Sequence, residues 1–511
     1  MSQHNLFAVL RAAFPAELDH TAIEAADTDP PLYYTWRDLE RGTAMIANLI
    51  EALDLPLQSR IAVQTEKSVE ALMLYLAVLR AGHVYLPLNT AYQAGEIEYF
   101  IGNAEPAMVV CSGKNFGWIS KLAFKAGTHR VFTLNDDRSG TLLDRAAQMP
   151  EVHEPAQRGP DDLAAILYTS GTTGRSKGAM LTHGNLASNA QVLKHAWGWQ
   201  RGDVLVHALP IFHVHGLFVA GHGALLAGAK MIWFARFDAR AVAARLPEAT
   251  VFMGVPTFYV RLLGEPALTQ EACANVRLFV SGSAPLLIET FTDWHKRTGH
   301  TILERYGMSE TVMLTSNPYR PESARRGGTV GLALPGVGVR VHDVKGRPLA
   351  AGEIGGLEVK GPNVFKGYWR MPEKTADEFT TDLWFKTGDV GRIDTEGYIT
   401  IVGRSKDLII TGGYNVYPAE VEGTINDIPG VAESAVIGVP HPDFGEAVVA
   451  VLTVKAGARI EANAVIAQLK TQIANFKIPK KVFVVDELPR NTMGKVQKNL
   501  LREQHKALFA A

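Results

Sequence analysis

The sequence of 511 residues predicts an α/β protein: a large N-terminal domain of parallel-rich sheets with helices, an attached β subdomain, and a small α+β C-terminal domain. Three observations predict this architecture. From residue 60 to about 310, short apolar runs alternate with helical patterns, as in parallel sheets with crossover helices. From 331 to 401, glycine punctuates short strand-like runs, which is typical of antiparallel sheet. After 403, a separate set of strands and one helix follows.

The elements of the N-terminal part follow from their patterns. Apolar residues recur near helical spacing over 68–79 before Gly82, so a helix is expected there and a strand at 83–88. Further buried strands are expected at 164–168, 204–209, 251–255, 276–280 and 301–304. Since open α/β sheets bind ligands beyond the carboxyl ends of their strands, the turns after these strands are expected to share one crevice.

The C-terminal part is expected to be its own domain. Strands are expected at 433–438, 447–454 and 482–485, and a helix at 462–474. We therefore expect two domains, 1–403 and 404–511.

The composition excludes several classes of protein. Fifty-one Lys and Arg against 52 Asp and Glu give a net charge of -1, so no overall field favours nucleic acid. Cys111 and Cys273 are the only cysteines, which excludes a disulfide framework and indicates the cytoplasm. The first 14 residues lack a signal-peptide pattern, and the apolar stretch 216–234 is interrupted by His222 and Lys230, so no membrane span is expected.

A loop rich in glycine and hydroxyl groups gives the clearest functional signal. It reads YTSGTTGRSKG over 168–178 and directly follows an apolar strand. Gly171 and Gly174 allow close backbone approach to a ligand, and Lys177 adds a positive charge. The loop also offers the hydroxyls of Thr169, Ser170, Thr172 and Thr173. It predicts a phosphate-binding loop that is not a Walker A motif, because Gly178 follows the lysine.

Seven motifs in one order resemble the adenylate-forming acyl-CoA synthetases over almost the whole chain. They are YTSGTTGRSKG, LPIFHVHG (209–216), SGSAPL (281–286), ERYGMSET (304–311), WFKTGDVGRID (384–394), GRSKDLIITGGYNVYPAEVE (403–422) and LPRNTMGKVQK (488–498). Several segments are similar to malonyl-CoA synthetases in particular. The resemblance implies an enzyme that uses ATP, Mg²⁺ and coenzyme A.

The resemblance also implies the nucleotide site. Asp389 would grip the ribose hydroxyls and Arg404 would contact ribose or phosphate, since a carboxylate accepts two hydrogen bonds. Tyr306 would stack on adenine. The backbone near the base would come from Gly282, Ser283 and the ERYGMS turn, which contains Glu304, Arg305, Gly307, Met308 and Ser309.

Charge must be offset at the phosphates during adenylation. By resemblance, Glu310 is a Mg²⁺ ligand with Thr169 as a partner, and Lys495 is the adenylation lysine. Lys495 is then also a candidate for a lysine acetyltransferase and deacetylase, because acetylation would remove its charge.

The thioester step would follow rotation of the mobile C-terminal domain about Lys406, which lies at the family's hinge position. Gly412 and Gly413 would then line the pantetheine channel, where the absence of side chains leaves room.

The acyl site is expected near His213, which would close it, with Ser281 close by. A dicarboxylate buries a second carboxylate that needs a cation or several donors, and the candidates are Arg277 and His215. We therefore predict conversion of malonate, or methylmalonate, with ATP and coenzyme A to the acyl-CoA, AMP and diphosphate. The alternatives are a ligase for an aryl, short-chain or medium-chain acid, a domain that loads a carrier protein, and a catalytically silent nucleotide-binding protein.

Overall fold

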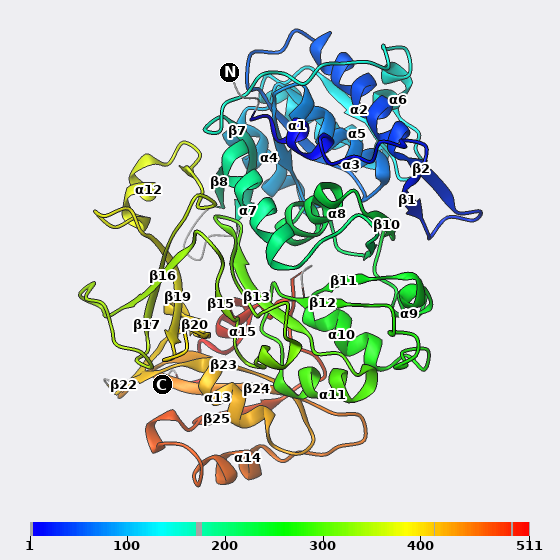
Figure 1. The fold of residues 1–511 in the computed structure, drawn as a ribbon. Coiled ribbons are helices and arrows are strands. Elements are labelled where there is room, and N and C mark those ends of the chain that lie inside the picture. Colours follow the sequence, from blue (N-terminus) through cyan, green and yellow to red (C-terminus); the bar gives the residue numbers. More distant parts are fainter. Residues whose placement is uncertain (1–3, 170–175, 413, 492–493, 510–511) are drawn as a thin grey trace. The chain divides into compact units, whose positions relative to one another are not determined.

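The computed structural model describes residues 4–169, 176–412, 414–491 and 494–509 (Figure 1). They form two compact units, one of residues 1–338 and 360–383 and the other of 339–359 and 384–511. The second unit groups the β subdomain with the C-terminal strands. The boundary expected between 403 and 404 stays a prediction.

A seven-stranded sheet of the first unit carries the glycine-rich loop. Its order is β18-β8-β7-β4-β3-β5-β6, and its central strands run parallel. The strands are β3 (Arg60–Gln64), β4 (Val84–Pro87), β5 (Met108–Cys111), β6 (Val131–Thr133), β7 (Leu163–Thr169), β8 (Lys177–Thr182) and β18 (Gly367–Tyr368).

A nine-stranded sheet makes up the rest of this unit, in the order β15-β14-β13-β12-β11-β9-β10-β1-β2. The parallel strands β1, β10, β9, β11, β12 and β13 lie between antiparallel edges. The strands are β1 (Thr21–Ala25), β2 (Leu32–Thr35), β9 (Val204–His207), β10 (Lys230–Trp233), β11 (Val251–Gly254), β12 (Leu278–Ser281), β13 (Leu303–Met308), β14 (Val312–Ser316) and β15 (Leu332–Ala333).

Helices connect and cover these strands. Several begin at side-chain caps, such as Ser68, which accepts the amide of Ala71 before α3. The helices of the first unit are α1 (Leu6–Arg11), α2 (Trp36–Glu51), α3 (Val69–Arg80), α4 (Ala94–Ala104), α5 (Gly113–Lys125), α6 (Thr141–Ala146), α7 (His183–Ala196), the π-helix η1 (His215–Gly221), α8 (His222–Ala227), α9 (Ala239–Arg245), α10 (Pro256–Leu263), α11 (Ile288–Thr298) and α12 (Pro372–Glu378). The short 3₁₀ turns are η2 (Leu246–Glu248) and η3 (Glu322–Ala324).

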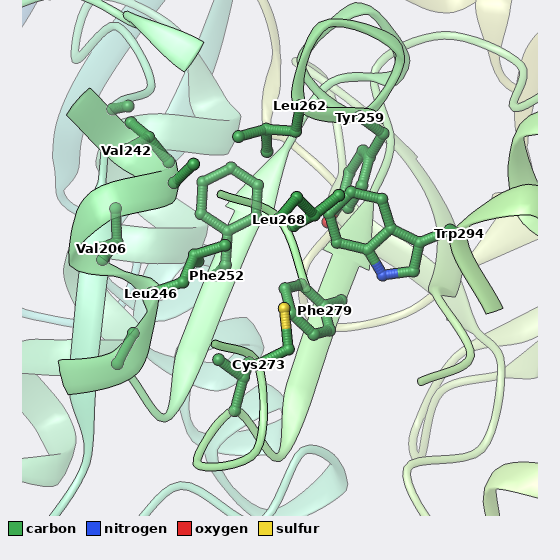
Figure 2. Packing of buried hydrophobic residues seen from close by; sticks show 14 of the residues in the cluster. Val206, Val242, Leu246, Phe252, Tyr259, Leu262, Leu268, Cys273, Phe279 and Trp294 are labelled. Atoms are coloured by element: carbon green, nitrogen blue, oxygen red, sulfur yellow. The ribbon is translucent and has the colours of Figure 1, made fainter. Parts of the chain in front are cut away.

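A large apolar cluster fixes the nine-stranded sheet against its helices (Figure 2). Trp294 from α11 packs edge-on against Tyr259 from α10, with ring centroids 4.8 Å apart, and against Phe279 of β12. The Tyr259 hydroxyl donates to the carbonyl of Val280 over 2.7 Å. Each fully buried side chain of this size contributes about 1.5–3 kcal/mol. The cluster, which includes Phe252 of β11 and Phe279 of β12, therefore packs these two strands against α10 and α11.

The second unit contains two sheets. The β subdomain has the order β16-β17-β19-β20, and the C-terminal sheet joins β22, β21, β24 and β23, with β25 parallel to β24. The strands are β16 (Gly338–His342), β17 (Gly355–Lys360), β19 (Phe385–Ile393), β20 (Ile399–Arg404), β21 (Ile409–Thr411), β22 (Tyr414–Val416), β23 (Val431–His441), β24 (Gly445–Val454) and β25 (Lys481–Val484). The helices are η4 (Ser405–Asp407), α13 (Pro418–Asn426), α14 (Ala462–Leu469), η5 (Asn475–Lys477) and α15 (Lys498–His505).

The predicted fold class is confirmed, and each expected strand overlaps an observed one. The expected helix at 462–474 ends earlier, at Leu469. Among the described residues, no helix combines the length and apolarity needed to cross a membrane.

Candidate active site

The glycine-rich loop joins two antiparallel strands. Tyr168 of β7 lies opposite Gly178 of β8, and Thr169 lies opposite Lys177. A Cβ on Gly178 would lie 2.9 Å from Ile166, so glycine is needed for this close pairing. The predicted phosphate ligands Ser170, Gly171, Thr172, Thr173 and Gly174 lie outside the described residues.

Lys177 and Glu310 both contact Tyr368, the lysine at the ring and the glutamate at the hydroxyl. The Lys177 Nζ lies 4.3 Å from the centroid of the Tyr368 ring and 3.3 Å from Glu378 Oε1. The Tyr368 hydroxyl donates to Glu310 Oε1 over 3.0 Å. Glu310 is buried, and its carbonyl accepts the amide of Phe365. Sequence reasoning missed Tyr368 and Glu378, which lie in the segment between the ERYGMSET and WFKTGDVGRID motifs.

The residues present fit a magnesium ion held with its nucleotide. No cluster of three or more His, Cys, Asp or Glu side chains suited to a metal lies within the described residues. Mg²⁺ is usually held by one or two carboxylates together with water and phosphate oxygens. Glu310, oriented by Tyr368, is a carboxylate of this kind, and Thr169 at the end of β7 lies on the strand that enters the loop.

The turns after β12 and β13 bring two sequence motifs together. Ser281 pairs with Glu304 across the two strands. Ser283 has a φ of +74°, and the guanidinium of Arg305 lies so near Gly282 that a Cβ there would be 2.4 Å from its Cζ. Gly307 also has no room for a side chain, because a Cβ would lie 1.8 Å from the Val312 carbonyl oxygen. The predicted residues Tyr306 and Met308 lie in β13 on either side of Gly307, Ser309 follows the strand, and all three are partly buried.

Burial shifts the pKa values of Glu304 and Arg305, the two charged residues that begin the ERYGMSET motif. Burial raises the pKa of Glu304 to about 8, and the amide of Leu286, which donates to its Oε1 over 3.4 Å, offsets only part of this shift. Glu304 is therefore mostly protonated at neutral pH. Burial also lowers the pKa of Arg305 to about 9, and no described residue accepts a hydrogen bond from its Nε or Nη2.

His215 lies beside this arginine, at the start of the π-helix η1. It is fully buried, and its Nδ1 lies 3.3 Å from the Ser283 hydroxyl. Its Nε2 has no hydrogen-bond partner among the described residues, and the same holds for the hydroxyl of Ser281. Burial, together with the charge of Arg305, lowers the pKa of His215, so the ring is neutral. His213 is partly buried, and its Nδ1 accepts the amide of His215 over 3.3 Å.

Arg277 lies in a different setting from the one expected. Its Nε donates to Asp203 Oδ1 over 2.8 Å, a second nitrogen pairs with Oδ2, and Nη1 donates to the carbonyl of Trp197. Its guanidinium also lies over the ring of Tyr319. The hydrogen-bonding groups of Arg277 are engaged with the protein, which does not favour a contact with the substrate, and the expected substrate role of Arg277 stays a prediction. Arg305, in contrast, is a buried cation whose Nε and Nη2 have no acceptor among the described residues.

In the second unit, the predicted nucleotide and adenylation residues gather around one ion pair. Asp389 of β19 lies opposite Arg404 of β20, and Arg404 Nε is 2.7 Å from Asp389 Oδ1. Loss of hydration and the charges of Arg404 and Lys406 lower the pKa of Lys495 to about 8. Lys495 is still exposed to solvent, so its dehydration is partial. Its amide donates to the side chain of Asn491.

The predicted hinge and channel residues follow β20 in the sequence. Lys406 is exposed in the 3₁₀ turn η4, and Gly412 follows β21 with a φ of +55°. This left-handed conformation favours glycine. Gly413 lies outside the described residues.

Comparison with known proteins places this arrangement in a family. Residues 11–369 match the AMP-binding enzyme family, and residues 420–495 match the AMP-binding enzyme C-terminal domain. The chain is 35% identical to a malonate–CoA ligase of Arabidopsis thaliana, over 87% of this chain and 78% of that protein. It is 33% identical to a feruloyl-CoA synthase of an Amycolatopsis species, over 92% of this chain and 94% of that protein.

A solved structure gives the same result. ATP-bound MatB from Rhodopseudomonas palustris aligns with a TM-score of 0.96 and 54% identity, over 99% of this chain and all of that one. A benzoate CoA ligase from Burkholderia xenovorans aligns with a TM-score of 0.87 and 27% identity, over 98% of this chain and all of that one. The chain belongs to the AMP-binding enzyme family.

Proposed function

We propose that this protein is a malonate–CoA ligase that forms malonyl-CoA, AMP and diphosphate from malonate, ATP and coenzyme A. The observation that carries the choice of acid is Arg305, a buried guanidinium with open donors beside His215 and Ser283. A buried charge without a partner is costly, and a carboxylate of the substrate would offset that cost. Of the two carboxylates of malonate, one would meet Arg305 and the other would react.

The chemistry takes place in two balanced steps. In the first, a carboxylate oxygen of malonate bonds to the α-phosphorus of ATP while the bond to diphosphate breaks. In the second, the sulfur of coenzyme A bonds to the acyl carbon, AMP leaves, and the thiol proton passes to solvent or to a basic group. The overall charge build-up falls on the phosphates, where fixed cations stabilise the transition state.

The residues divide this work by their chemistry. Glu310 would hold Mg²⁺, which offsets phosphate charge when it is bound with the nucleotide. Asp389 would accept hydrogen bonds from the ribose, next to Arg404. Lys495 would place its ammonium against the carboxylate and α-phosphate oxygens during adenylation. His215 would donate from its open Nε2 to the second carboxylate if that nitrogen carries the ring proton.

The test compares acids on the wild-type enzyme and on two Arg305 variants. With malonate, methylmalonate, propionate, benzoate and ferulate, we expect AMP and diphosphate chiefly from malonate and methylmalonate. Arg305→Met should lower kcat/KM for malonate by a factor of about 100 or more, because the second carboxylate would then be buried without a cation. Propionate should lose little.

Arg305→Lys is the matched control, since it keeps a charge but not the planar guanidinium. It should recover part of the malonate activity. Equal losses for malonate and propionate in Arg305→Met would contradict the assignment of Arg305, and a wild-type enzyme that prefers propionate or ferulate would contradict the choice of malonate.

We also propose that acetylation of Lys495 controls the adenylation step. Two features support it: the exposure of the side chain and the lowered pKa, which makes the amine more nucleophilic near neutral pH. Protein carrying acetyl-lysine at position 495 should release no diphosphate, and a deacetylase should restore the rate. Retained activity would rule out this control.

A cytoplasmic location, in keeping with the free buried thiols Cys111 and Cys273, likewise remains a proposal.

A further inference from the structure

A buried lysine of the first unit, Lys67, is linked through His207 to the segment that carries His215 and has no role in the chemistry described above. Lys67 stands directly before α3, and its Nζ contacts three acceptors. It lies 2.9 Å from His207 Nδ1, 2.9 Å from the His207 carbonyl and 2.7 Å from the Phe234 carbonyl. The ring of Trp233 lies 4.2 Å from the same nitrogen. The three acceptors match the three hydrogens of one ammonium group.

The partner of Lys67 makes a second contact that fixes its proton. The Nε2 of His207 lies 2.9 Å from the carbonyl oxygen of Gly216. A carbonyl only accepts hydrogen bonds, so Nε2 must carry a hydrogen and donate it. The other two contacts of the Lys67 Nζ are carbonyl oxygens, which also only accept, so all three contacts require a hydrogen from this nitrogen. The ammonium form of Lys67 supplies three hydrogens, although burial lowers its pKa, and His207 Nδ1 accepts one of them. Lys67 therefore selects the ring tautomer that holds Gly216.

Gly216 belongs to the segment that places His215. A Cβ on Gly216 would lie 2.1 Å from the carbonyl oxygen of Pro210, so the backbone of Gly216 packs directly against that carbonyl and leaves no room for a side chain. The amide of Leu217 donates to the His213 carbonyl over 3.0 Å, and the amide of His215 donates to His213 Nδ1. A shift of the Gly216 carbonyl would therefore be passed on to His215, one residue away.

We propose that Lys67 and His207 are positioning residues for the acyl site: Lys67 sets the tautomer of His207, and His207 anchors Gly216 so that His215 faces the second carboxylate of the substrate. Neither side chain touches the substrate in this role. The inference rests on the proposed function, because it concerns the selection of a dicarboxylate by the same site.

Two substitutions of His207 separate the two contacts of its ring. The side-chain nitrogen of Gln reaches the place of Nε2 and can still donate to Gly216, whereas Asn reaches only the place of Nδ1 and leaves Gly216 without its donor. Lys67→Met keeps the ring and removes the charge that selects its tautomer. His183→Gln is the matched control, because His183 is equally buried but its Nδ1 accepts the amide of Leu6, away from this segment.

The measurement is the ratio of kcat/KM for malonate to that for propionate, together with KM for ATP and the thermal midpoint. His207→Asn and Lys67→Met should lower the ratio by about ten-fold or more with KM for ATP unchanged, since a mispositioned hydrogen-bonding group loses selection against an analogue that lacks the partner. His207→Gln should keep most of the ratio, and His183→Gln should keep all of it even if its midpoint falls.

Unchanged selectivity in His207→Asn, with a folded protein, would overturn the inference and leave the proposed function intact. If the wild-type enzyme itself does not prefer malonate, the proposed function fails first. Equal selectivity losses in His207→Gln and His207→Asn would also overturn the inference, because the donor to Gly216 would then not be the group that matters.

Discussion

At the scale of single residues, the ionisation of Lys495 links pH to the adenylation step. Its lowered pKa, about 8, comes from partial dehydration and from the charges of Arg404 and Lys406. In the role proposed for Lys495 the transition state needs the protonated amine, so the rate should fall as pH rises through this value rather than near the ordinary value for lysine, about 10.4.

The pH dependence of kcat/KM for adenylation should therefore show a descending limb near pH 8, measured by diphosphate release. Lys495→Arg should have a lower rate but no such limb, because a guanidinium stays protonated. A limb of the same midpoint in both proteins would assign the titration to another group.

Arg277 offers a test of a structural role against a substrate role. The carboxylate of Asp203 is fully buried and accepts two bonds from Arg277 and one from Thr250. Arg277→Met would leave this carboxylate without its cation, which typically costs about 3–5 kcal/mol. The thermal midpoint should fall by several degrees, whereas KM for malonate should change by less than about two-fold.

The double variant Arg277→Met with Asp203→Leu is the control, because it removes both buried charges and should recover much of the midpoint. A large rise in KM for malonate without a loss of stability would return Arg277 to the acyl site.

At the scale of elements, the π-helix η1 depends on glycine at one position and not at another. A Cβ at Gly216 would lie 2.1 Å from the carbonyl oxygen of Pro210, but a Cβ at Gly221 would meet only the Gly216 oxygen at 3.4 Å. Gly216→Ala must therefore move backbone, and Gly221→Ala need not.

We expect Gly216→Ala to lower kcat/KM for malonate by about 100-fold, since displacement of catalytic groups by about 1 Å has effects of this size. Gly221→Ala should retain activity within a few-fold. Malonate-dependent exchange of labelled diphosphate into ATP measures both. Similar rates for the two variants would mean that the segment tolerates the shift.

Sequence patterns predicted the elements but not all of their partners. Short apolar runs followed by helical patterns located β7, β9, β11 and β13, because burial on both faces of a parallel sheet demands such runs. The pairing of Arg277 with Asp203 could not be predicted, because it joins residues 74 positions apart. The open donors of Arg305 depend in the same way on which groups the fold leaves nearby, and no spacing in the sequence encodes that.

At the scale of the whole molecule, the two half-reactions should separate by mutation. Lys495 and Gly412 both lie in the second unit, but the resemblance gives the first to adenylation and the second to the thioester step. Lys495→Ala should abolish diphosphate release yet convert supplied malonyl-adenylate and coenzyme A to the thioester. Gly412→Leu should do the reverse, because its side chain would fill the pantetheine channel that the resemblance implies there.

Quenched-flow measurement of diphosphate and malonyl-CoA on each variant gives both rates. A variant that slowed both steps equally would mean that its residue serves the fold rather than one step, and circular dichroism would identify that case.

The contact of Arg305 with Gly282 has a consequence for how the substrates influence one another. Gly282 belongs to the turn expected near adenine, while the guanidinium that presses on it is the group expected to hold the acid. A ligand that fixes Gly282 or Arg305 in position therefore changes the affinity of the protein for the other ligand, and thermodynamic linkage requires this effect to be mutual. Calorimetric titration of malonate, with and without a non-hydrolysable ATP analogue, should reveal tighter binding of the acid to the nucleotide-loaded protein. The affinity for the analogue should rise by the same factor when malonate is bound first. Affinities that do not depend on the other ligand would show that the contact between Arg305 and Gly282 does not couple the two sites.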